Sequence, residues 1–388
     1  IVDVLMSRAA FLFLVVFALG YAVYDVGTSL RLGFDVRCWN WPNITITLAL
    51  ILALYLARQI DRRMRDALHA LWLQGTFPEA ADPTATLQER ILAGRGRREA
   101  GCALLILLVM IAAYAWTEAP RLLWLMAALQ SPQVETSMWE EAVGLGGAVT
   151  LGLLSGLVAG AFFGRLATYG SMGAVLADKG TELNIRPGHF DGANGLKPVG
   201  DFYLYQALLT AIPLIWLAGW ALALPWYASA PCFVEVDPSY LWRLRWQFYG
   251  QWLVVASFTY FGFVRAVFLL RRRLIDARAD LVRNRLPQIE AEIARLKGLL
   301  SAPAEAERRD AIEARIHDLA REHWAIRHMS VWPMDRATFS KYAPVEIASN
   351  VVPVLVGPLL SLEETPAMAM PPASASVGSL VAWIGWLF

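Results

Sequence analysis

The sequence predicts an all-α fold: a polytopic integral membrane bundle of helices with an antiparallel helical hairpin on the cytoplasmic side. Three observations lead to this prediction. First, 57% of the 388 residues are hydrophobic and only 17% are charged, whereas soluble domains carry about 25% charged residues. Second, six apolar segments are about as long as a bilayer is thick. Third, Lys and Arg fall almost entirely on one side of these segments.

A membrane-spanning helix needs roughly 20 predominantly apolar residues to cross about 30 Å of hydrocarbon. The six expected spans are residues 9–24 (continuing past Asp25), 38–57, 100–117, 142–164, 202–226 and 247–264. They divide the chain into domains 1–57 (spans one and two), 58–99 (basic inner loop), 100–168 (spans three and four), 169–201 (Gly-rich inner loop), 202–270 (spans five and six), 271–330 (hairpin), 331–362 (membrane-apposed or re-entrant) and 363–388 (flexible tail with a short apolar end).

The orientation follows from the charges between the spans. With a cytoplasmic N-terminus, 29 of the 34 Lys and Arg residues lie inside and five outside. Cytoplasmic loops are enriched in Lys and Arg, so we expect both termini in the cytoplasm and the protein in a bacterial inner membrane. Eight tryptophans fall near the outer ends of the spans, where indole prefers the interface: Trp39, Trp41, Trp116, Trp124, Trp139, Trp226, Trp242 and Trp246.

Two cysteines, Cys38 and Cys232, fall in expected outer loops. In an oxidising compartment they can form a disulfide between the first and last outer loops, and the alternative is a pair of unlinked thiols. Residues 58–75 are expected to form an amphipathic inner helix, with Leu68, Leu71, Trp72 and Leu73 at the lipid headgroups. Residues 120–131 are apolar but too short to cross, which favours a separate interfacial helix.

Small residues recur every four positions along the fourth expected span. They are Gly144, Ala148, Gly152, Gly156, Gly160 and Gly164. Small residues at this spacing let a second helix approach closely in lipid. The row drifts by about 40° per step, so no straight single partner can use it all, and we expect packing on two sides. Packing within the bundle is the simpler interpretation; subunit contact and pore lining are the alternatives.

Apolar residues at helical spacing on either side of a break at 301–303 predict the hairpin. Ile289, Ile293, Leu296 and Leu300 face Ile312, Ile316, Leu319 and Ile326 in a coiled-coil-like pair. Pro287 should distort the first helix. Further on, residues 345–362 are apolar but broken by proline and glycine, so they form either a re-entrant segment or a seventh span.

The densest polar motif lies in the inner loop before the fifth span. His189 and Asp191 are two residues apart, followed by Asn194 and Lys197. As a functional site, they would bind a metal or an anion, with His189 and Asp191 as ligands, or these two would form an acid–base pair. As a structural motif, Asp-Gly and Asn-Gly form a tight turn in which Asp191 accepts backbone N–H groups. Two such side chains alone do not define a metal site, and no metal or cofactor is expected.

The stretch His189-Phe190-Asp191-Gly192-Ala193-Asn194-Gly195-Leu196 resembles a His-Pro-Asp-x-Ala-Gly-Gly-Leu signature of uncharacterised bacterial membrane proteins with a similar number of spans. Phe190 replaces the proline and Asn194 a glycine. The resemblance covers these eight residues and implies a polytopic membrane protein but no reaction.

The sequence carries no recognisable catalytic set, so an enzyme is disfavoured. A phosphate loop is absent, and no histidine lies in a span to activate a serine. We therefore expect a non-enzymatic membrane protein: an oligomeric channel, or an effector or scaffold whose hairpin (274–328) binds a cytoplasmic partner. The alternatives are an enzyme or receptor using the His189–Asp191 loop, and a small-solute transporter. The expected partners are lipid and either further copies of the chain or the other subunits of a membrane complex, with no nucleic acid.

Overall fold

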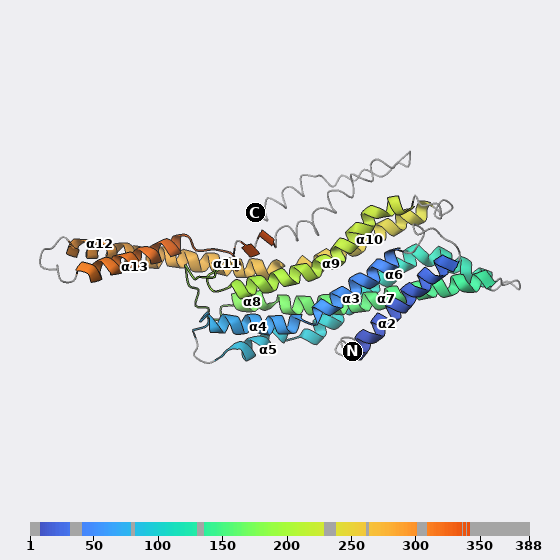
Figure 1. Ribbon diagram of the computed structural model, residues 1–388, viewed down its shortest axis with the longest axis horizontal. Coiled ribbons are helices and arrows are strands. Elements are labelled where there is room, and N and C mark those ends of the chain that lie inside the picture. The colour runs from blue at the N-terminus through green and yellow to red at the C-terminus, as the bar shows by residue number, and fades with distance from the viewer. Residues whose placement is uncertain are drawn as a thin grey trace.

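The computed structural model of this chain is helical throughout the part that it describes. It describes residues 8–31, 41–78, 82–129, 136–228, 238–260, 264–300, 309–335, 337–338 and 340–341, and no strand occurs among them. Figure 1 shows an elongated molecule with a helical bundle at one end and the α12–α13 pair at the other. The predicted all-α class is confirmed for these residues.

Each expected span lies largely within one helix. The corresponding helices are α2 (Arg8–Arg31), α3 (Trp41–Ala57), α6 (Arg95–Leu129), α7 (Thr136–Gly170), α9 (Lys197–Ala228) and α10 (Pro238–Thr259). Three helical stretches of the described chain are long and apolar enough to cross a membrane: Thr84–Thr117, Val149–Ala177 and Lys197–Leu224. Large apolar side chains on the outside of the bundle, such as Val16, Leu48, Leu104 and Leu253, are more than half exposed, as expected of a surface that meets lipid.

The separate interfacial helix expected at 120–131 is wrong. Residues 120–129 continue α6 without interruption, although Pro120 stands inside it. At 1.5 Å per residue α6 is about 52 Å long, so it extends beyond a hydrocarbon layer of about 30 Å.

The most tightly buried part of the bundle lies at the end nearest the α12–α13 pair. Four short elements meet there: α4 (Ile60–Leu73), α5 (Thr84–Leu92), α8 (Met172–Ala177) and the beginning of α9. Tyr203 on α9 is fully buried; its hydroxyl donates to the carbonyl oxygen of Gly170 at 2.8 Å and accepts the N–H of Gly173 at 2.6 Å. This hydroxyl therefore bridges the break between α7 and α8.

The interfacial role expected for residues 58–75 is also wrong for its central leucines. Leu68 and Leu71 are buried in the core at 1% and 0% exposure, not turned to lipid headgroups. Helix α4 runs roughly along the long axis of the molecule beside the start of α9 (Figure 1), and Arg63 of α4 lies 4.1 Å above the ring of Tyr205. Amphipathic spacing shows that one helix face is apolar, but it does not show whether lipid or protein covers that face.

The glycine row of α7 packs mainly against α6. A Cβ added at Gly160 would lie 2.6 Å from the carbonyl oxygen of Cys102, and one at Gly164 would lie 2.5 Å from Cα of Glu99. Gly152 and Gly156 face Tyr114 and Met110 of the same helix. Four members of the row thus lie against α6, while α7 as a whole also contacts α10 and α3. A partner that coils with the drifting row can follow it, which a straight helix cannot. Gly144 lies in α7, where its surroundings are outside the description.

The helical pair consists of α12 (Leu286–Leu300) and α13 (Arg309–Arg327), which follow α11 (Arg265–Asp280). The apolar residues predicted to face one another do pack together, with Ile289, Leu319 and Ile326 at 0–1% exposure. The ion pairs Arg285–Glu322 at 2.8 Å and Arg315–Glu292 at 3.4 Å show that the two helices are antiparallel.

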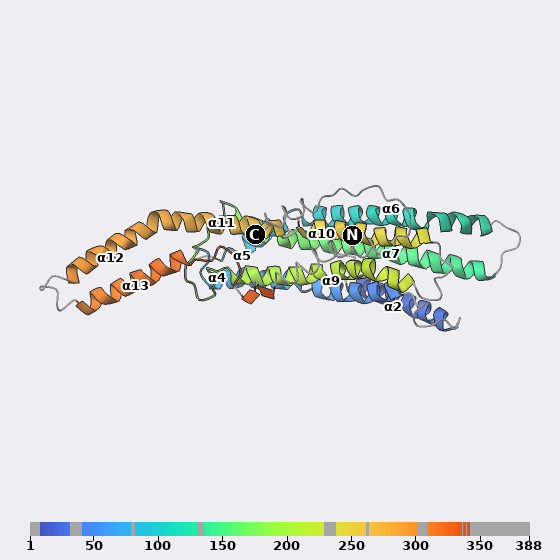
Figure 2. The same ribbon diagram turned by 90° about the horizontal axis from the view of Figure 1, so that it is seen from above.

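The distortion expected at Pro287 takes the form of a π-helical turn, Leu281–Arg285, just before it. Proline lacks the N–H that would donate to the carbonyl oxygen four residues earlier in an α-helix. A π-helical turn accommodates the residue that then falls outside the regular α-helical hydrogen-bond pattern. Figure 2 shows the change of direction between α11 and α12.

Several expectations fall outside the described residues. They are the Cys38–Cys232 disulfide, the hairpin turn, the segment 345–362 and the tail 363–388.

Candidate functional site: the junction between the bundle and the hairpin

The loop between α8 and α9, residues 178–196, is called the junction loop here. Asp191 lies at its centre and organises it. Oδ1 of Asp191 accepts the N–H groups of Ala193 at 2.9 Å and Gly195 at 3.0 Å, and Oδ2 accepts the N–H of Lys197 at 3.2 Å. Lys197 is the first residue of α9, so the same carboxylate also caps that helix.

The backbone of the junction loop requires the residues found in it. Gly192, Asn194 and Gly195 have φ values of 69°, 60° and 88°. This left-handed region costs little for glycine and is tolerated by asparagine, which explains the Asp-Gly and Asn-Gly steps.

His189 adds a further contact to the same carboxylate. Its Nδ1 lies 3.0 Å from Oδ1 of Asp191, and both side chains are buried, at 9% and 2% exposure. The short contact requires the proton on Nδ1, because the carboxylate can only accept. The imidazole also contacts the Phe190 ring in a tilted arrangement, with centroids 4.2 Å apart, and Phe190 itself is 85% exposed.

The partners of Asp191 set its ionisation. Burial alone would raise the pKa of this carboxyl, but the N–H groups of Gly195 and Ala193, the His189 side chain and the N–H of Lys197 together lower the pKa below its usual value. Asp191 is therefore ionised at neutral pH, with its oxygens already occupied by donors from its own loop. In this geometry Asp191 stabilises the turn through hydrogen bonds, and its oxygens have few lone pairs left to bind a ligand directly.

The junction loop is attached to the bundle on one side. The N–H of Asn184 donates to the carbonyl oxygen of Thr76 at 2.7 Å, and the Thr76 hydroxyl donates to the carbonyl oxygen of Gly195 at 3.0 Å. Arg90 of α5 pairs with Asp178 at 2.6 Å and donates to the Thr181 hydroxyl at 3.0 Å. The loop therefore connects to the segment after α4 and to α5.

On the other side, the junction loop holds the chain that leaves the hairpin. The side-chain amide of Asn194 donates to the carbonyl oxygen of Ser330 at 2.7 Å. Gly188 approaches α13 so closely that an added Cβ would lie 2.7 Å from Cβ of Ala325. The loop thus contacts both the end of α13 and the residues just after it.

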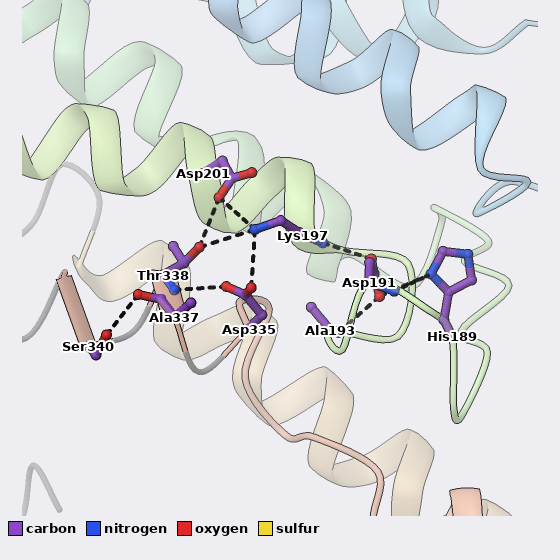
Figure 3. A network of polar contacts seen from close by, with 9 residues as sticks. All are labelled: His189, Asp191, Ala193, Lys197, Asp201, Asp335, Ala337, Thr338 and Ser340. Carbon is purple, nitrogen blue, oxygen red and sulfur yellow. Dashed lines mark hydrogen bonds and ion pairs between the residues drawn. The ribbon is translucent and has the colours of Figure 1, made fainter.

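Lys197 forms the centre of a second set of contacts with this chain (Figure 3). Its Nζ lies 3.2 Å from Oδ2 of Asp335 and 3.3 Å from Oδ1 of Asp201. The Thr338 hydroxyl donates to Asp201 at 2.9 Å, and Oδ1 of Asp335 accepts the N–H of Thr338 at 2.8 Å. The contacts with Thr338, followed by those with Lys197, lower the pKa of Asp335, which keeps this carboxylate ionised.

Aromatic contacts secure the same chain to α11. Trp332 lies edge-on to Phe268 with ring centroids 5.9 Å apart, and the guanidinium of Arg271 lies 4.7 Å from the Trp332 ring. Residues 330–335 and Thr338 are therefore held by the junction loop, by α9 and by α11 together.

The four candidates from the sequence, His189, Asp191, Asn194 and Lys197, thus lie at one place but in different roles. The first two shape the loop, and the last two contact the chain beyond the hairpin. Sequence reasoning missed Thr76, Arg90, Asp201, Asp335 and Thr338. Of these, only Asp335 has a local signal, because Asp is one of the residues preferred at the N-cap of a helix.

The described residues do not form a metal centre, since they contain no group of three or more His, Cys, Asp or Glu side chains placed to hold an ion. Comparisons of the chain with protein-family models, with curated proteins and with solved structures return no match.

Proposed function

We propose that this chain is a bacterial inner-membrane protein that crosses the bilayer six times with both termini in the cytoplasm. Support comes from the six apolar segments, each of which lies largely in one helix, and from the Lys and Arg bias between them. In this orientation the junction loop and the α12–α13 hairpin are cytoplasmic.

Its function in this proposal is that of a non-enzymatic membrane effector or scaffold. The hairpin binds a cytoplasmic protein partner. The junction couples the two parts, so that a movement of the hairpin changes the conformation of the bundle. The observation that carries the proposal is that the junction loop is bonded on both sides: Thr76 and Arg90 hold it to the bundle, and Asn194 and Lys197 hold the chain leaving the hairpin.

The effector is either an oligomeric channel or a scaffold, and the enzyme, receptor and transporter alternatives rank below both. Asp191 lacks the open geometry that the enzyme or receptor alternative needs, because its oxygens accept three backbone N–H groups and one of them lies 3.0 Å from Nδ1 of His189. The transporter alternative lacks a specific observation in its favour.

The orientation is tested by cysteine labelling in intact cells. In a background without the native cysteines, Gly298→Cys places a thiol on α12 where nothing lies within 4 Å. Ser131→Cys, in an expected outer loop, is the matched control. A membrane-impermeant maleimide should label Ser131→Cys in intact cells and Gly298→Cys only after permeabilisation. Labelling of Gly298→Cys in intact cells would overturn the orientation.

The effector role is tested on the purified full-length chain in lipid. Spin labels at Gly298→Cys and at an exposed α5 site, Glu89→Cys, report the distance between hairpin and bundle. Asn194→Gly with Lys197→Ala should broaden this distance distribution, whereas Arg309→Ala at the far end of the hairpin should not. An unchanged distribution in the double variant contradicts the coupling. For the channel form, a monomeric mass together with no ion flux in liposomes is the contradicting result.

A further inference from the structure

A ring of five helices in the bundle encloses a cavity of about 120 Å³. The helices α3, α9, α10, α6 and α7 follow one another around it, each in contact with the next, and α7 closes the ring against α3. All the lining residues lie within the expected spans, so in a bilayer the cavity lies at the level of the hydrocarbon. It is partly open and not sealed.

The wall of the cavity is almost entirely apolar. Ile106, Phe162, Phe163 and Val255 are typical of the lining. Trp216 also contributes, but its indole N–H already donates to the Thr45 hydroxyl at 2.9 Å. A buried water needs two to four polar partners, which this wall does not offer. The cavity therefore suits an apolar occupant better than water or an ion.

One polar group breaks this pattern. Gln251 of α10 lines the cavity, and its side-chain amide donates to the thioether sulfur of Met110 at 3.2 Å. A thioether is a weak acceptor, so a carbonyl or hydroxyl oxygen inside the cavity would be a better partner for this N–H. The amide thus supplies a single directional contact in an otherwise apolar site, as in many small-molecule pockets.

We propose that the cavity binds one small, largely apolar molecule that carries a carbonyl or hydroxyl oxygen and enters from the bilayer. The size agrees with a single six-membered ring, since an engineered apolar cavity of about 150 Å³ binds benzene. The apolar wall takes the ring, and Gln251 takes the oxygen. This inference does not depend on the effector role proposed above.

The test uses the full-length chain in nanodiscs with ¹³C-labelled methionine methyl groups, the Met110 signal being assigned from Met110→Leu. Cyclohexanone is the probe, and methylcyclohexane is its counterpart without an oxygen. Cyclohexanone should shift the Met110 signal saturably and at a several-fold lower concentration than methylcyclohexane. A shift that rises linearly with added probe, as for partition into the bilayer, overturns the proposal.

Variants separate the two parts of the site. Ala159→Phe fills the cavity and should abolish the saturable shift, while Leu105→Phe on the exposed face of α6 should leave it unchanged. Val254→Phe is the second filling variant if Ala159→Phe is not monodisperse. Gln251→Leu should make the two probes bind equally. A saturable shift that survives filling overturns the site, and an unchanged preference for the ketone in Gln251→Leu overturns the role of the amide.

Discussion

Replacing Gly160 by alanine tests how closely α6 and α7 must approach. The new Cβ would lie 2.6 Å from the carbonyl oxygen of Cys102 and closer still to Cα of Ala103. Carbon atoms pack at about 3.5–4.0 Å, so the two backbones would have to separate by about 1 Å. Both contacts are with backbone atoms, which cannot rotate away as a side chain can.

The expected effect combines two opposing contributions. Alanine favours the helix over glycine by up to about 1 kcal/mol. Overpacking costs about 1–3 kcal/mol, and more where backbone must move. Gly146 of the same helix has nothing within 4 Å, so Gly146→Ala should show only the helix-propensity gain. The helix-propensity gain is common to both variants, so we expect Gly160→Ala to be less stable than Gly146→Ala by the overpacking cost alone, about 1–3 kcal/mol or more.

The assay is reversible unfolding of each variant in mixed micelles with increasing sodium dodecyl sulfate, followed by circular dichroism. The difference between the two variants is the quantity of interest, because both carry the same Gly-to-Ala change in one helix. If the two variants unfold at the same detergent fraction, the close α6–α7 contact at Gly160 is refuted.

Three further predictions concern the junction and the hairpin. Asn194→Ala should destabilise the junction by about 1–3 kcal/mol, since it strains a residue at φ 60° and removes the bond to Ser330; hydrogen exchange of residues 329–335 measures it, and Asn194→Gly should recover the strain component alone. The pKa of Asp191 is lower in the folded than in the unfolded chain. The stability that ionised Asp191 contributes to the fold is therefore fully present above about pH 4 and is lost as the pH falls further through the folded pKa. Asp191→Asn should remove this part of the acid dependence of unfolding, and an acid profile identical to that of the unmodified chain contradicts the assignment. Leu319→Ala, at a fully buried hairpin position, should cost about 2–5 kcal/mol of local stability in hydrogen exchange, against under about 1 kcal/mol for the exposed Arg315→Ala; equal effects would mean that Leu319 is not in the hairpin core.

The hairpin is a part of the fold that the spacing of apolar residues predicts correctly. The spacing of Ile289, Leu296, Ile312 and Leu319 predicts two apolar stripes that face one another, and the structure pairs these stripes. The prediction is correct here because the two helices are neighbours in sequence, so each apolar stripe has the other as its nearest packing partner. The same holds for the spans, where length and apolar composition alone indicate a helix.

For helix α4 and the glycine row, the spacing of residues along the chain does not predict which element covers them. The apolar face of α4 is visible in the sequence, yet Leu68 and Leu71 are covered by protein and not by lipid. The row on α7 indicates the close approach of another helix, but it does not show that α6 is the helix that lies against Gly152, Gly156, Gly160 and Gly164. In both cases the identity of the covering element depends on how distant helices assemble.

The sequence by itself determined the helical class, the positions of the apolar helices, the hairpin and the tight turn at Asp191, because each depends on residues a few positions apart. Only the tertiary structure decided that the turn joins the bundle to the hairpin. The bond from Asn194 to Ser330 spans 136 positions and that from Lys197 to Asp335 spans 138. No periodicity encodes such a pairing, because it depends on where the packed helices bring the two segments in space.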